Sequence, residues 1–392
     1  MQKDKAWFSE FVSEVKTKSF YKEPLIWAFG RVEKGVLEPD KTLSVSYAVV
    51  NFKENFGSVA VMLWALNECG IRLDTTKSEA VIELTKEVTT KALSCFEPFK
   101  DEIEKHRNFA NLALIDELLD DPKNRFCVTF IFEDEKPKSV EAIYLKLYSL
   151  SLGKAPLRSL NLDDIFITLP NLAWTKEQKP VELEWLRQNE MRLKMMGEYP
   201  VIKSVDKIPL FLSHIIPDDS VKITDTTKVR VGAFLANGTT IMPGASYVNF
   251  NSGTIGTAMI EGRVSSSAIV SEGSDIGGGA SILGVLSGTS GNPITIGKKC
   301  LLGANSVAGI SLGDGCIIDG GLAILEGMKV FIDDENKKLL LEENPEFKFN
   351  KDIYKAKELE GLNKLHFRRD SQTGQVKATF ASKKIKLNKD LH

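Results

Sequence analysis

Long apolar runs are missing from this chain. No stretch of its 392 residues reaches the ~18–20 continuous apolar residues that a membrane-spanning helix needs. The first residues, MQKDKAWFSEFVSEVK, lack the apolar core and cleavage site of a secretory signal peptide. No membrane attachment is therefore expected.

Metal-binding cysteine motifs and an excess of one charge are absent too. The five cysteines show no CxxC spacing, so neither a zinc ribbon nor a disulfide framework is expected, and reduced thiols are the default. The formal net charge is only −2, which gives no general reason to bind nucleic acid or an anionic membrane. These absences predict a cytoplasmic protein.

Residues 1–215 carry no nucleotide-binding fingerprint. Neither a G-x-G-x-x-G turn after a strand nor a P-loop occurs there. The apolar spacing instead predicts a mixed α/β domain, with helices at 77–96, 140–152 and 181–196 and a strand at 125–134. These residues do not indicate what the domain does.

Glycine is concentrated in one region, residues 221–330, which holds 21 of the chain's 29 glycines. Such a density excludes helices. Apolar residues recur there at every sixth position, in three phases: Val229, Leu235, Ile241 and Tyr247; Ile296, Leu302 and Ala308; Leu312, Ile318, Ile324 and Val330. A period of six fits a hexapeptide solenoid, in which three short strands make one triangular coil of about 18 residues.

The pattern therefore predicts a left-handed parallel β-helix over 216–332, after the α/β domain. Segment 286–293 breaks the period and is interpreted as a projecting loop. Residues 333–392 contain QTGQ between alternating apolar runs, which predicts a hairpin in a small C-terminal β cap. The predicted fold is an α/β domain, a hexapeptide-repeat β-helix and this cap.

Histidine is missing from the solenoid, because the four histidines are His106, His214, His366 and His392. A three-histidine zinc site of the gamma-class carbonic anhydrase kind is therefore impossible on the coils. The same absence argues against acyltransferases of this fold that use a coil histidine as general base. An acyltransferase without a catalytic histidine, or a non-enzymatic solenoid, remains.

Two segments of the solenoid carry a family resemblance: VRVGAFLANGTTIMPGASYVNFNSGTIGTAMIEGRVSSSAIVSEGSDIGGGASILGVLSGT and ITIGKKCLLGANSVAGISLGDGC. Together with LPNLAWT (169–175) and NKLHFRRDSQTGQV (363–376), they resemble the tetrahydrodipicolinate N-succinyltransferase family, in its branch with an extended N-terminal domain. The resemblance implies transfer of a succinyl group from succinyl-CoA to the amino group of L-2-amino-6-oxopimelate. That acceptor forms by hydration of tetrahydrodipicolinate, in the diaminopimelate–lysine pathway.

The resemblance also implies site residues, a homotrimer with active sites between subunits, and no permanently bound cofactor. Glu261, in MIEGR, matches the family's active-site carboxylate, and its role as acyl acceptor or general base stays open. Gly284, in SILGVL, matches a backbone N–H donor to the oxyanion. Contacts to CoA or its succinyl group fall on Arg263, Gly278, Ser281, Ala304, Asp319, Gly320, Gly327, Lys355, Arg368, Arg369, Asp370 and Ser371.

Adjacent strand residues face opposite sides, so only one of Arg368 and Arg369 is expected to reach a CoA phosphate directly. The acceptor is a dicarboxylate, and Arg230, Lys298 and Lys299 are candidate cations for it. The run VNFN (248–251) could orient the acceptor, or its asparagines could only support the coil.

No metal is expected on the threefold axis, because Lys228 and Ala245 stand where some relatives of this family hold a divalent ion. Two alternatives stay open for the function. One is a related hexapeptide acyltransferase that uses acetyl-CoA, and it needs no cation for a succinyl carboxylate. The other is a non-catalytic solenoid scaffold, for which loss of the Glu261 carboxylate would have little effect.

Overall fold

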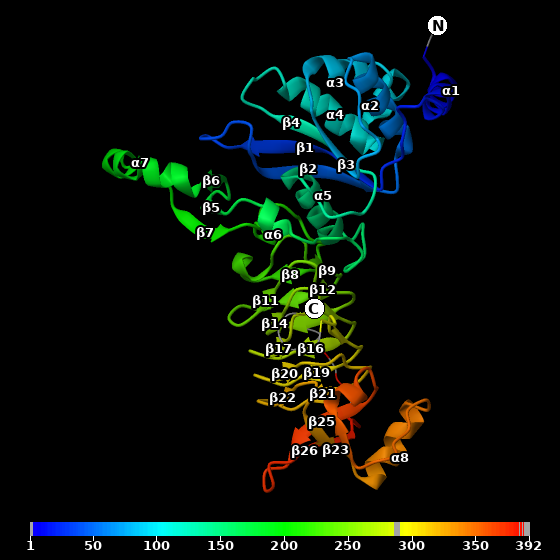
Figure 1. Cartoon of the computed structure of the whole chain (residues 1–392), viewed down its shortest axis with the longest axis vertical. Coiled ribbons are helices and arrows are strands. Elements are labelled where there is room, and N and C mark those ends of the chain that lie inside the picture. Colours follow the sequence, from blue (N-terminus) through cyan, green and yellow to red (C-terminus); the bar gives the residue numbers. More distant parts are fainter. Residues whose placement is uncertain (1–2, 286–290, 384, 386, 388–392) are drawn as a thin grey trace. The chain divides into compact units, whose positions relative to one another are not determined.

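A computed structural model describes residues 3–285, 291–383, 385 and 387, so most of the predicted loop at 286–293 lies outside the described residues. The chain divides into two compact units (Figure 1). Unit 1 is Met1–Ser149 with Ser159–Pro209, and unit 2 is Leu150–Arg158 with Leu210–His392.

Unit 1 is built on a four-stranded antiparallel sheet of order β2-β1-β4-β3. Helices α2, α3 and α4 lie on one face of this sheet and α5 on the other (Figure 1). The elements are α1 (Lys5–Lys16), β1 (Ile26–Lys34), β2 (Thr42–Phe52), α2 (Phe56–Glu68), β3 (Glu79–Glu83), α3 (Lys86–Leu93), η1 (Glu97–Lys105), α4 (Arg107–Leu118), β4 (Phe126–Ile131) and α5 (Val140–Ser151).

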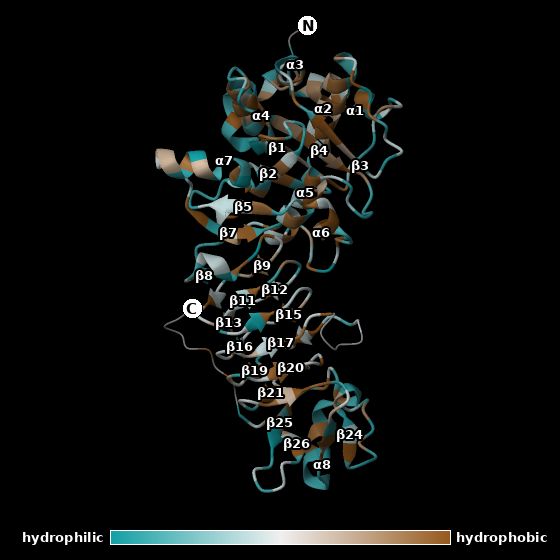
Figure 2. Ribbon diagram, turned by 60° about the vertical axis from the view of Figure 1, so that its left-hand side comes forward, coloured by the Kyte–Doolittle hydropathy of each residue, from teal (hydrophilic) through white to brown (hydrophobic). Residues whose placement is uncertain are grey.

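The core of unit 1 lies between this sheet and α2. Trp27 and Phe29 of β1 and Phe130 of β4 pack with Met62 and Leu66 of α2, and all five are buried. Strand β4, with the sequence FCVTFI, is correspondingly apolar along its length (Figure 2). Burial of such large side chains contributes about 2 kcal/mol each, so this core is a large favourable contribution to the stability of the unit.

The predicted helix at 77–96 is wrong in its first half. Glu79–Glu83 forms β3, which pairs with β4 along its whole length, and only Lys86–Leu93 is helical. Pairing with β4 outweighs the helical spacing of the local apolar residues. Thr85 starts the helix, because its hydroxyl accepts the Val88 N–H at 3.4 Å. The predicted strand at 125–134 and the helices at 140–152 and 181–196 are confirmed by β4, α5 and α7.

A second antiparallel sheet of unit 1, of order β6-β5-β7, packs Leu172 and Trp174 with Leu43 of the first sheet. Its elements are α6 (Ile165–Thr168), β5 (Leu172–Thr175), β6 (Pro180–Glu182), α7 (Leu183–Met196) and β7 (Ile202–Asp206).

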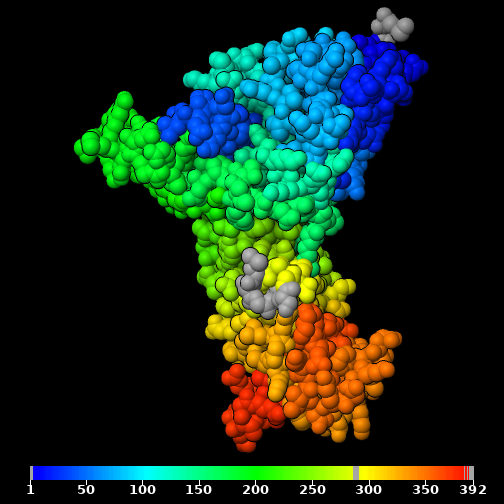
Figure 3. Space-filling view, viewed as in Figure 1, coloured from blue at the N-terminus to red at the C-terminus, as the bar shows by residue number. Residues whose placement is uncertain are grey.

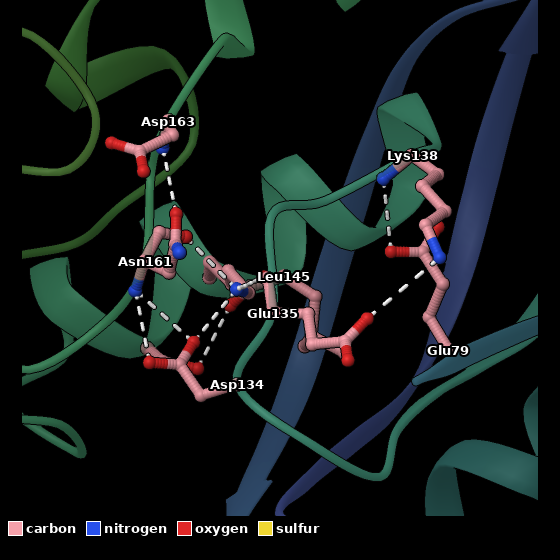
Figure 4. Close-up of polar contacts among 9 residues, drawn as sticks. Glu79, Asp134, Glu135, Lys138, Leu145, Asn161 and Asp163 are labelled. Atoms are coloured by element: carbon pink, nitrogen blue, oxygen red, sulfur yellow. Dashed lines mark hydrogen bonds and ion pairs between the residues drawn. The ribbon is translucent and has the colours of Figure 1, made fainter. Parts of the chain in front are cut away.

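Polar contacts fasten the loops around α5 (Figure 4). The Asp134 carboxylate accepts the Asn161 backbone N–H at 3.1 and 3.0 Å, and the Lys138 N–H donates to Glu79 at 3.0 Å. The ammonium of Lys146, a buried residue of α5, donates to Asp134 at 2.7 Å and to the carbonyls of Glu135 and Asn161. All three of its protons are thus satisfied, which is the condition for burying a charge.

Unit 2 is the predicted left-handed parallel β-helix with its C-terminal cap. Its coils have three faces, which the chain follows in the order C, A, B. Face A comprises β8 (Lys222–Ile223), β10 (Thr240–Ile241), β13 (Ala258–Ile260), β16 (Ser274–Ile276), β19 (Leu301–Leu302) and β21 (Ile317–Ile318). Face B comprises β11 (Tyr247–Val248), β14 (Arg263–Val264), β17 (Ser281–Ile282), β20 (Val307–Ala308) and β22 (Ala323–Ile324). Face C comprises β9 (Phe234–Leu235), β12 (Gly253–Thr254), β15 (Ile269–Val270) and β18 (Thr295–Ile296).

The sixfold phases predict the inward side chains with one error. All the predicted positions are buried except Tyr247, which is partly exposed, while its neighbour Val248 is fully buried. The corner between Ile241 and Val248 carries one residue more than a six-residue step, and this shifts the phase. Two other corners are two residues shorter, from Ile260 to Val264 and from Ala308 to Leu312.

A coil that contains one of these short corners is shorter than the expected 18 residues, whereas the coil from Val264 to its partner Ile282 has 18. Thr254 pairs with Val270, and Leu302 pairs with Ile318, so such a coil takes about 16 residues. The stack has about five coils between Leu235 and Ile324.

The cap continues face A beyond β21. Strand β25 (Leu365–Arg369) pairs in parallel with β21, so that Phe367 lies beside Ile318 as the next buried residue. The hairpin from β25 to β26 (Val376–Phe380) runs through the predicted QTGQ turn. Figure 3 shows these C-terminal residues, in orange and red, against the last coils. The remaining elements are η2 (Phe211–Ser213), η3 (Thr226–Lys228), β23 (Lys329–Phe331), α8 (Asp334–Glu343), β24 (Ile353–Lys355) and η4 (Ala356–Leu359). Helix α8 was not predicted from the sequence. No helix among the described residues is long and apolar enough to cross a membrane.

Candidate active site

The corner where the chain turns from face A to face B, here the A–B corner, gathers many of the predicted site residues. Five residues that directly follow the buried residues of face A occupy successive rungs there: Glu261, Gly277, Gly303, Asp319 and Arg368. Backbone bonds join the rungs, for example from Glu261 N–H to Ile276 O at 2.8 Å and from Asp319 N–H to Phe367 O at 3.0 Å. Glu261 and Asp319 are three rungs apart, which is roughly 14 Å at about 4.8 Å per rung.

Glu261 stands on one of the two short corners. Only Glu261, Gly262 and Arg263 separate the buried Ile260 and Val264. A side chain at Gly262 would place its Cβ 2.3 Å from the carbonyl oxygen of Ala280 on the next rung, so only glycine fits there. On this tight turn, the acid Glu261 and the guanidinium of Arg263 are only two residues apart.

The rungs after Glu261 leave the surface of this corner almost bare. A Cβ on Gly278 would lie 3.6 Å from Glu261 Oε2, and one on Gly320 would lie 3.2 Å from the carbonyl oxygen of Ala304. Positions 278, 304 and 320 therefore carry at most a methyl group between Glu261 and Asp319. An extended ligand could lie along this edge and contact backbone groups.

Arg263 and Ser281 are paired residues on adjacent rungs of face B. The Arg263 guanidinium donates to Ser281 Oγ from Nε at 3.1 Å and from Nη2 at 2.7 Å. Ser281 is buried beneath it, whereas Arg263 is exposed. The guanidinium is thus held on the outer side of face B, two residues beyond Glu261 in the chain, with donors left for an anionic group.

At the far end of the corner, the C-terminal strand β25 supplies two side chains to Asp319. His366 Nε2 lies 2.7 Å from Asp319 Oδ1, and Arg368 Nε lies 3.4 Å from Oδ2. Arg368 thus belongs to the A–B corner, while its exposed neighbour Arg369 pairs with Val376 in the hairpin. The expectation that only one of the two arginines reaches a CoA phosphate stays a prediction.

Asp370 has a structural role in the β25–β26 hairpin. Its carboxylate accepts the N–H groups of Gln372 and Thr373 at 3.0 and 2.9 Å and the Lys377 ammonium at 2.7 Å. These bonds, that from Lys377 first, hold the pKa of Asp370 well below its usual range. Ser371 is exposed in the same turn.

Lys355 starts η4, and its backbone N–H donates to Glu358 at 2.7 Å. Strand β24, which ends at this residue, pairs with β23 beyond the last coil. The structure thus places Lys355 outside the A–B corner, in the cap.

Gly284 and Gly327 lie at a different corner, where face B turns to face C. A Cβ on Gly284 would lie 3.1 Å from Ser265 Cβ, whereas no atom lies within 4 Å of such a Cβ on Gly327. Glu261 and Gly284 flank opposite ends of the face B strands, so they are roughly 10 Å or more apart within one chain at about 3.3 Å per residue. One chain does not bring the two predicted catalytic groups together.

The candidate cations for the acceptor are also dispersed. Arg230 lies near the corner between faces B and C, 5.8 Å from the centroid of the Tyr247 ring, and its Nη1 lies 3.4 Å from Asn249 Oδ1. Lys298 and Lys299 follow β18, at the corner between faces C and A. Within one chain, none of the three is placed at the A–B corner.

The asparagines of VNFN support the coil. Asn249 accepts from its neighbour Phe250 N–H at 2.9 Å, and Asn251 accepts the Arg158 N–H at 2.7 Å. Lys228 stands at one of the positions where a divalent ion was not expected. Its ammonium donates to Gly244 O at 2.7 Å. Among the described residues, no cluster of histidine, cysteine, aspartate or glutamate could hold a metal ion.

His366, which contacts the candidate site residue Asp319, was not predicted from the sequence. Its signal was the alternation in LHFRR, where the apolar Leu365 and Phe367 alternate with His366 and Arg368. This pattern puts His366 and Arg368 on the outer side, but only the parallel pairing with β21 shows that they meet Asp319.

Family models and known proteins agree with this architecture. A model described as "Tetrahydrodipicolinate N-succinyltransferase N-terminal" matches residues 6–167, one described as the "middle" of the same enzyme matches 169–209, and "Hexapeptide repeat of succinyl-transferase" matches 293–326.

Curated relatives match over nearly the whole chain. Proteins named 2,3,4,5-tetrahydropyridine-2,6-dicarboxylate N-succinyltransferase from Nitratiruptor sp. and Campylobacter jejuni are 52% and 53% identical, each over 98% of this chain and 98% of its own length. A crystal structure titled as a putative 2,3,4,5-tetrahydropyridine-2-carboxylate N-succinyltransferase from Campylobacter jejuni has a TM-score of 0.93 at 53% identity, covering 98% of this chain and 99% of its own. Full-length identity at this level, on the same fold, shows that the chain belongs to the tetrahydrodipicolinate N-succinyltransferase family.

Proposed function

We propose that this protein transfers the succinyl group of succinyl-CoA to the amino nitrogen of L-2-amino-6-oxopimelate, formed by hydration of tetrahydrodipicolinate, in lysine biosynthesis. The observation that carries the proposal is the short corner at Ile260–Val264. It presents an acid, Glu261, and a guanidinium, Arg263, beside an edge otherwise bare of large side chains. Family membership supports the same reaction.

In this reaction the amine nitrogen attacks the thioester carbon, a C–N bond forms and the C–S bond breaks. The amine loses a proton and the thiolate of CoA gains one, so a group that moves a proton is required at the nitrogen. Glu261 supplies a carboxylate for this role, and it could instead accept the acyl group first. Both routes need a donor to the oxyanion, for which we assign the backbone N–H of Gly284.

The donor would lie along the A–B corner. The pantetheine arm of CoA is extended, and the edge from Glu261 to Arg368 covers four rung steps, roughly 19 Å at about 4.8 Å per rung. Gly278, Ala304 and Gly320 expose backbone groups along it. Arg263 would bind the succinyl carboxylate, since a planar guanidinium suits a carboxylate. Arg368 at the far end would meet the phosphates.

The separation of Glu261 from Gly284 and Gly327 supports a homotrimer. Parallel β-helices around a threefold axis bring different corners of neighbouring chains together, so that each cleft is completed by a second copy. Each site would combine Glu261 of one chain with CoA-binding coils of two, and monomers would be inactive. The five unpaired cysteines suit a reducing cytoplasm.

Free thiol release tests the proposal. Purified protein is mixed with tetrahydrodipicolinate and either succinyl-CoA or acetyl-CoA, with each donor alone as the control. Release that requires the acceptor and prefers succinyl-CoA is expected. Preference for acetyl-CoA would point to an acetyltransferase of the same fold, and no release with either donor would point to a scaffold.

A further inference from the structure

The contact between His366 and Asp319 joins residues 47 positions apart in sequence. His366 Nε2 lies 2.7 Å from Asp319 Oδ1, within the cap and the last complete coil respectively. A carboxylate only accepts hydrogen bonds, so the imidazole proton must be on Nε2. A neutral His366 ring is therefore the Nε2–H tautomer. Whether the ring is neutral or charged, the contact holds one carboxylate oxygen of Asp319 in place.

The Asp319 carboxylate has a partner at each oxygen and is still accessible to a ligand. Its second oxygen faces Arg368 Nε at 3.4 Å, and its backbone N–H donates to Phe367 O at 3.0 Å. The Asp319 side chain is nevertheless 41% exposed, whereas that of His366 is 20% exposed. Carboxylate oxygens offer about four lone-pair sites, so positions remain for a donor from outside.

Asp319 lies on the same edge as Glu261, and Gly277, Gly278, Gly303 and Ala304 on the rungs between them carry at most a methyl group. Among the groups of CoA, the phosphates are anionic and would be repelled by a carboxylate. The amide N–H groups of the pantetheine arm are donors, and a charged acceptor makes the stronger hydrogen bond with them. An ordered Asp319 at this place thus suits the arm, while Arg368 beside it suits the phosphates.

We infer that His366 is a positioning residue for the CoA donor: it holds the Asp319 carboxylate in the orientation that accepts a hydrogen bond from the pantetheine arm. This inference rests on the proposed function, because it needs CoA to lie along the A–B corner. It goes beyond that function by giving the cap histidine a role in donor affinity.

Two substitutions distinguish a positioning role of His366 from a general effect on the structure of the hairpin. His366→Leu removes the donor, and His366→Gln returns an N–H donor near the place of Nε2. For His366→Leu, the KM for succinyl-CoA and the Kd for CoA in calorimetric titration are expected to rise about tenfold, while kcat changes less than threefold. His366→Gln is expected to recover most of the affinity. Thr379→Val, at the strand position paired with His366, is the matched control for the hairpin.

The double variant of His366→Leu with Asp319→Ala completes the test. If the two residues act as a unit, the double variant binds CoA no more weakly than Asp319→Ala alone. Independent losses that multiply, or a Kd for CoA unchanged in His366→Leu, would overturn the inference. A loss in His366→Leu that the Gln variant does not recover and that Thr379→Val shares would also overturn it, as an effect of the hairpin alone. Failure of the proposed function would look different and would be seen in the wild-type protein: a scaffold would neither bind CoA nor release thiol, and an acetyltransferase would release thiol chiefly from acetyl-CoA.

Discussion

Arg263 and Ser281 lie on adjacent rungs, and two nitrogens of the one guanidinium donate to the single hydroxyl of the other, at 3.1 and 2.7 Å. The hydroxyl anchors the planar group two residues from Glu261, and under the proposed function this guanidinium would bind the succinyl carboxylate.

Arg263→Lys is therefore expected to affect one donor and not the other. A lysine places a single ammonium without the fixed fork, so the KM for succinyl-CoA is expected to rise about tenfold while activity with acetyl-CoA stays as it was. Initial rates with both donors measure this. Arg187→Lys, an exposed arginine of unit 1 paired with Glu184, is the matched control. An equal loss with both donors would show that Arg263 does not recognise the succinyl carboxylate.

Glu261→Gln keeps the shape of the side chain and removes its proton-accepting oxygen. The value of kcat is expected to fall about 100-fold or more, because general acid–base groups contribute on the order of 10²–10⁴. Thermal stability should hardly change, since the residue is partly exposed in a turn. Glu272→Gln, an exposed glutamate at another corner of the same β-helix, serves as the comparison. Wild-type turnover in the Gln variant would remove Glu261 from the mechanism.

Gly262→Ala tests the short corner itself. The new methyl group would lie 2.3 Å from the Ala280 carbonyl oxygen, so the rung must shift, and a loss of about 2 kcal/mol or more in the free energy of unfolding is expected. Gly327→Ala, where no atom lies within 4 Å, should change that free energy by less than about 0.5 kcal/mol. Denaturation followed by circular dichroism compares the two. Equal stability would mean that the corner accommodates a side chain.

Asp370→Asn tests the hairpin through its pH dependence. The folded-state pKa of this carboxyl is lowered, chiefly by the hydrogen bond from Lys377. A group with a lowered pKa stabilises the fold at pH above its unfolded value near 4, and this contribution is lost as the pH falls toward the folded value. Amide exchange at Gln372 and Thr373 should therefore be faster in the variant than in the wild type at pH 7, and the difference should shrink below about pH 4. A ratio that does not change with pH would contradict this account.

Periodicity predicted the β-helix well because each face contributes one inward residue about every six positions, as Ile296, Leu302 and Ala308 do on faces C, A and B. It failed at Tyr247, where one extra corner residue moves the buried position to Val248. It also left the short corner at Glu261 unnoticed, although the steps from Thr254 to Ile260 to Val264 are visible in the sequence.

Prediction from the sequence was also limited by contacts between residues that are distant in the chain. Helical spacing at 77–96 was misleading because β3 gains its partner, β4, from residues more than 40 positions away. The meeting of His366 with Asp319 depends in the same way on the pairing of β25 with β21. For Glu261 and Gly284, family resemblance supplied the roles, and spacing alone would not have distinguished them from ordinary turn residues.

Strand β25 directly follows β21 on face A, although the chain reaches it only after β23 and β24. During synthesis the coils can stack one after another in the order in which they leave the ribosome, but the edge of β21 must wait for residues some 50 positions downstream. Until then the growing chain exposes unpaired backbone that invites association with other chains. A chain truncated before residue 365 would thus lack the strand that carries His366 and Arg368, and it would tend to aggregate.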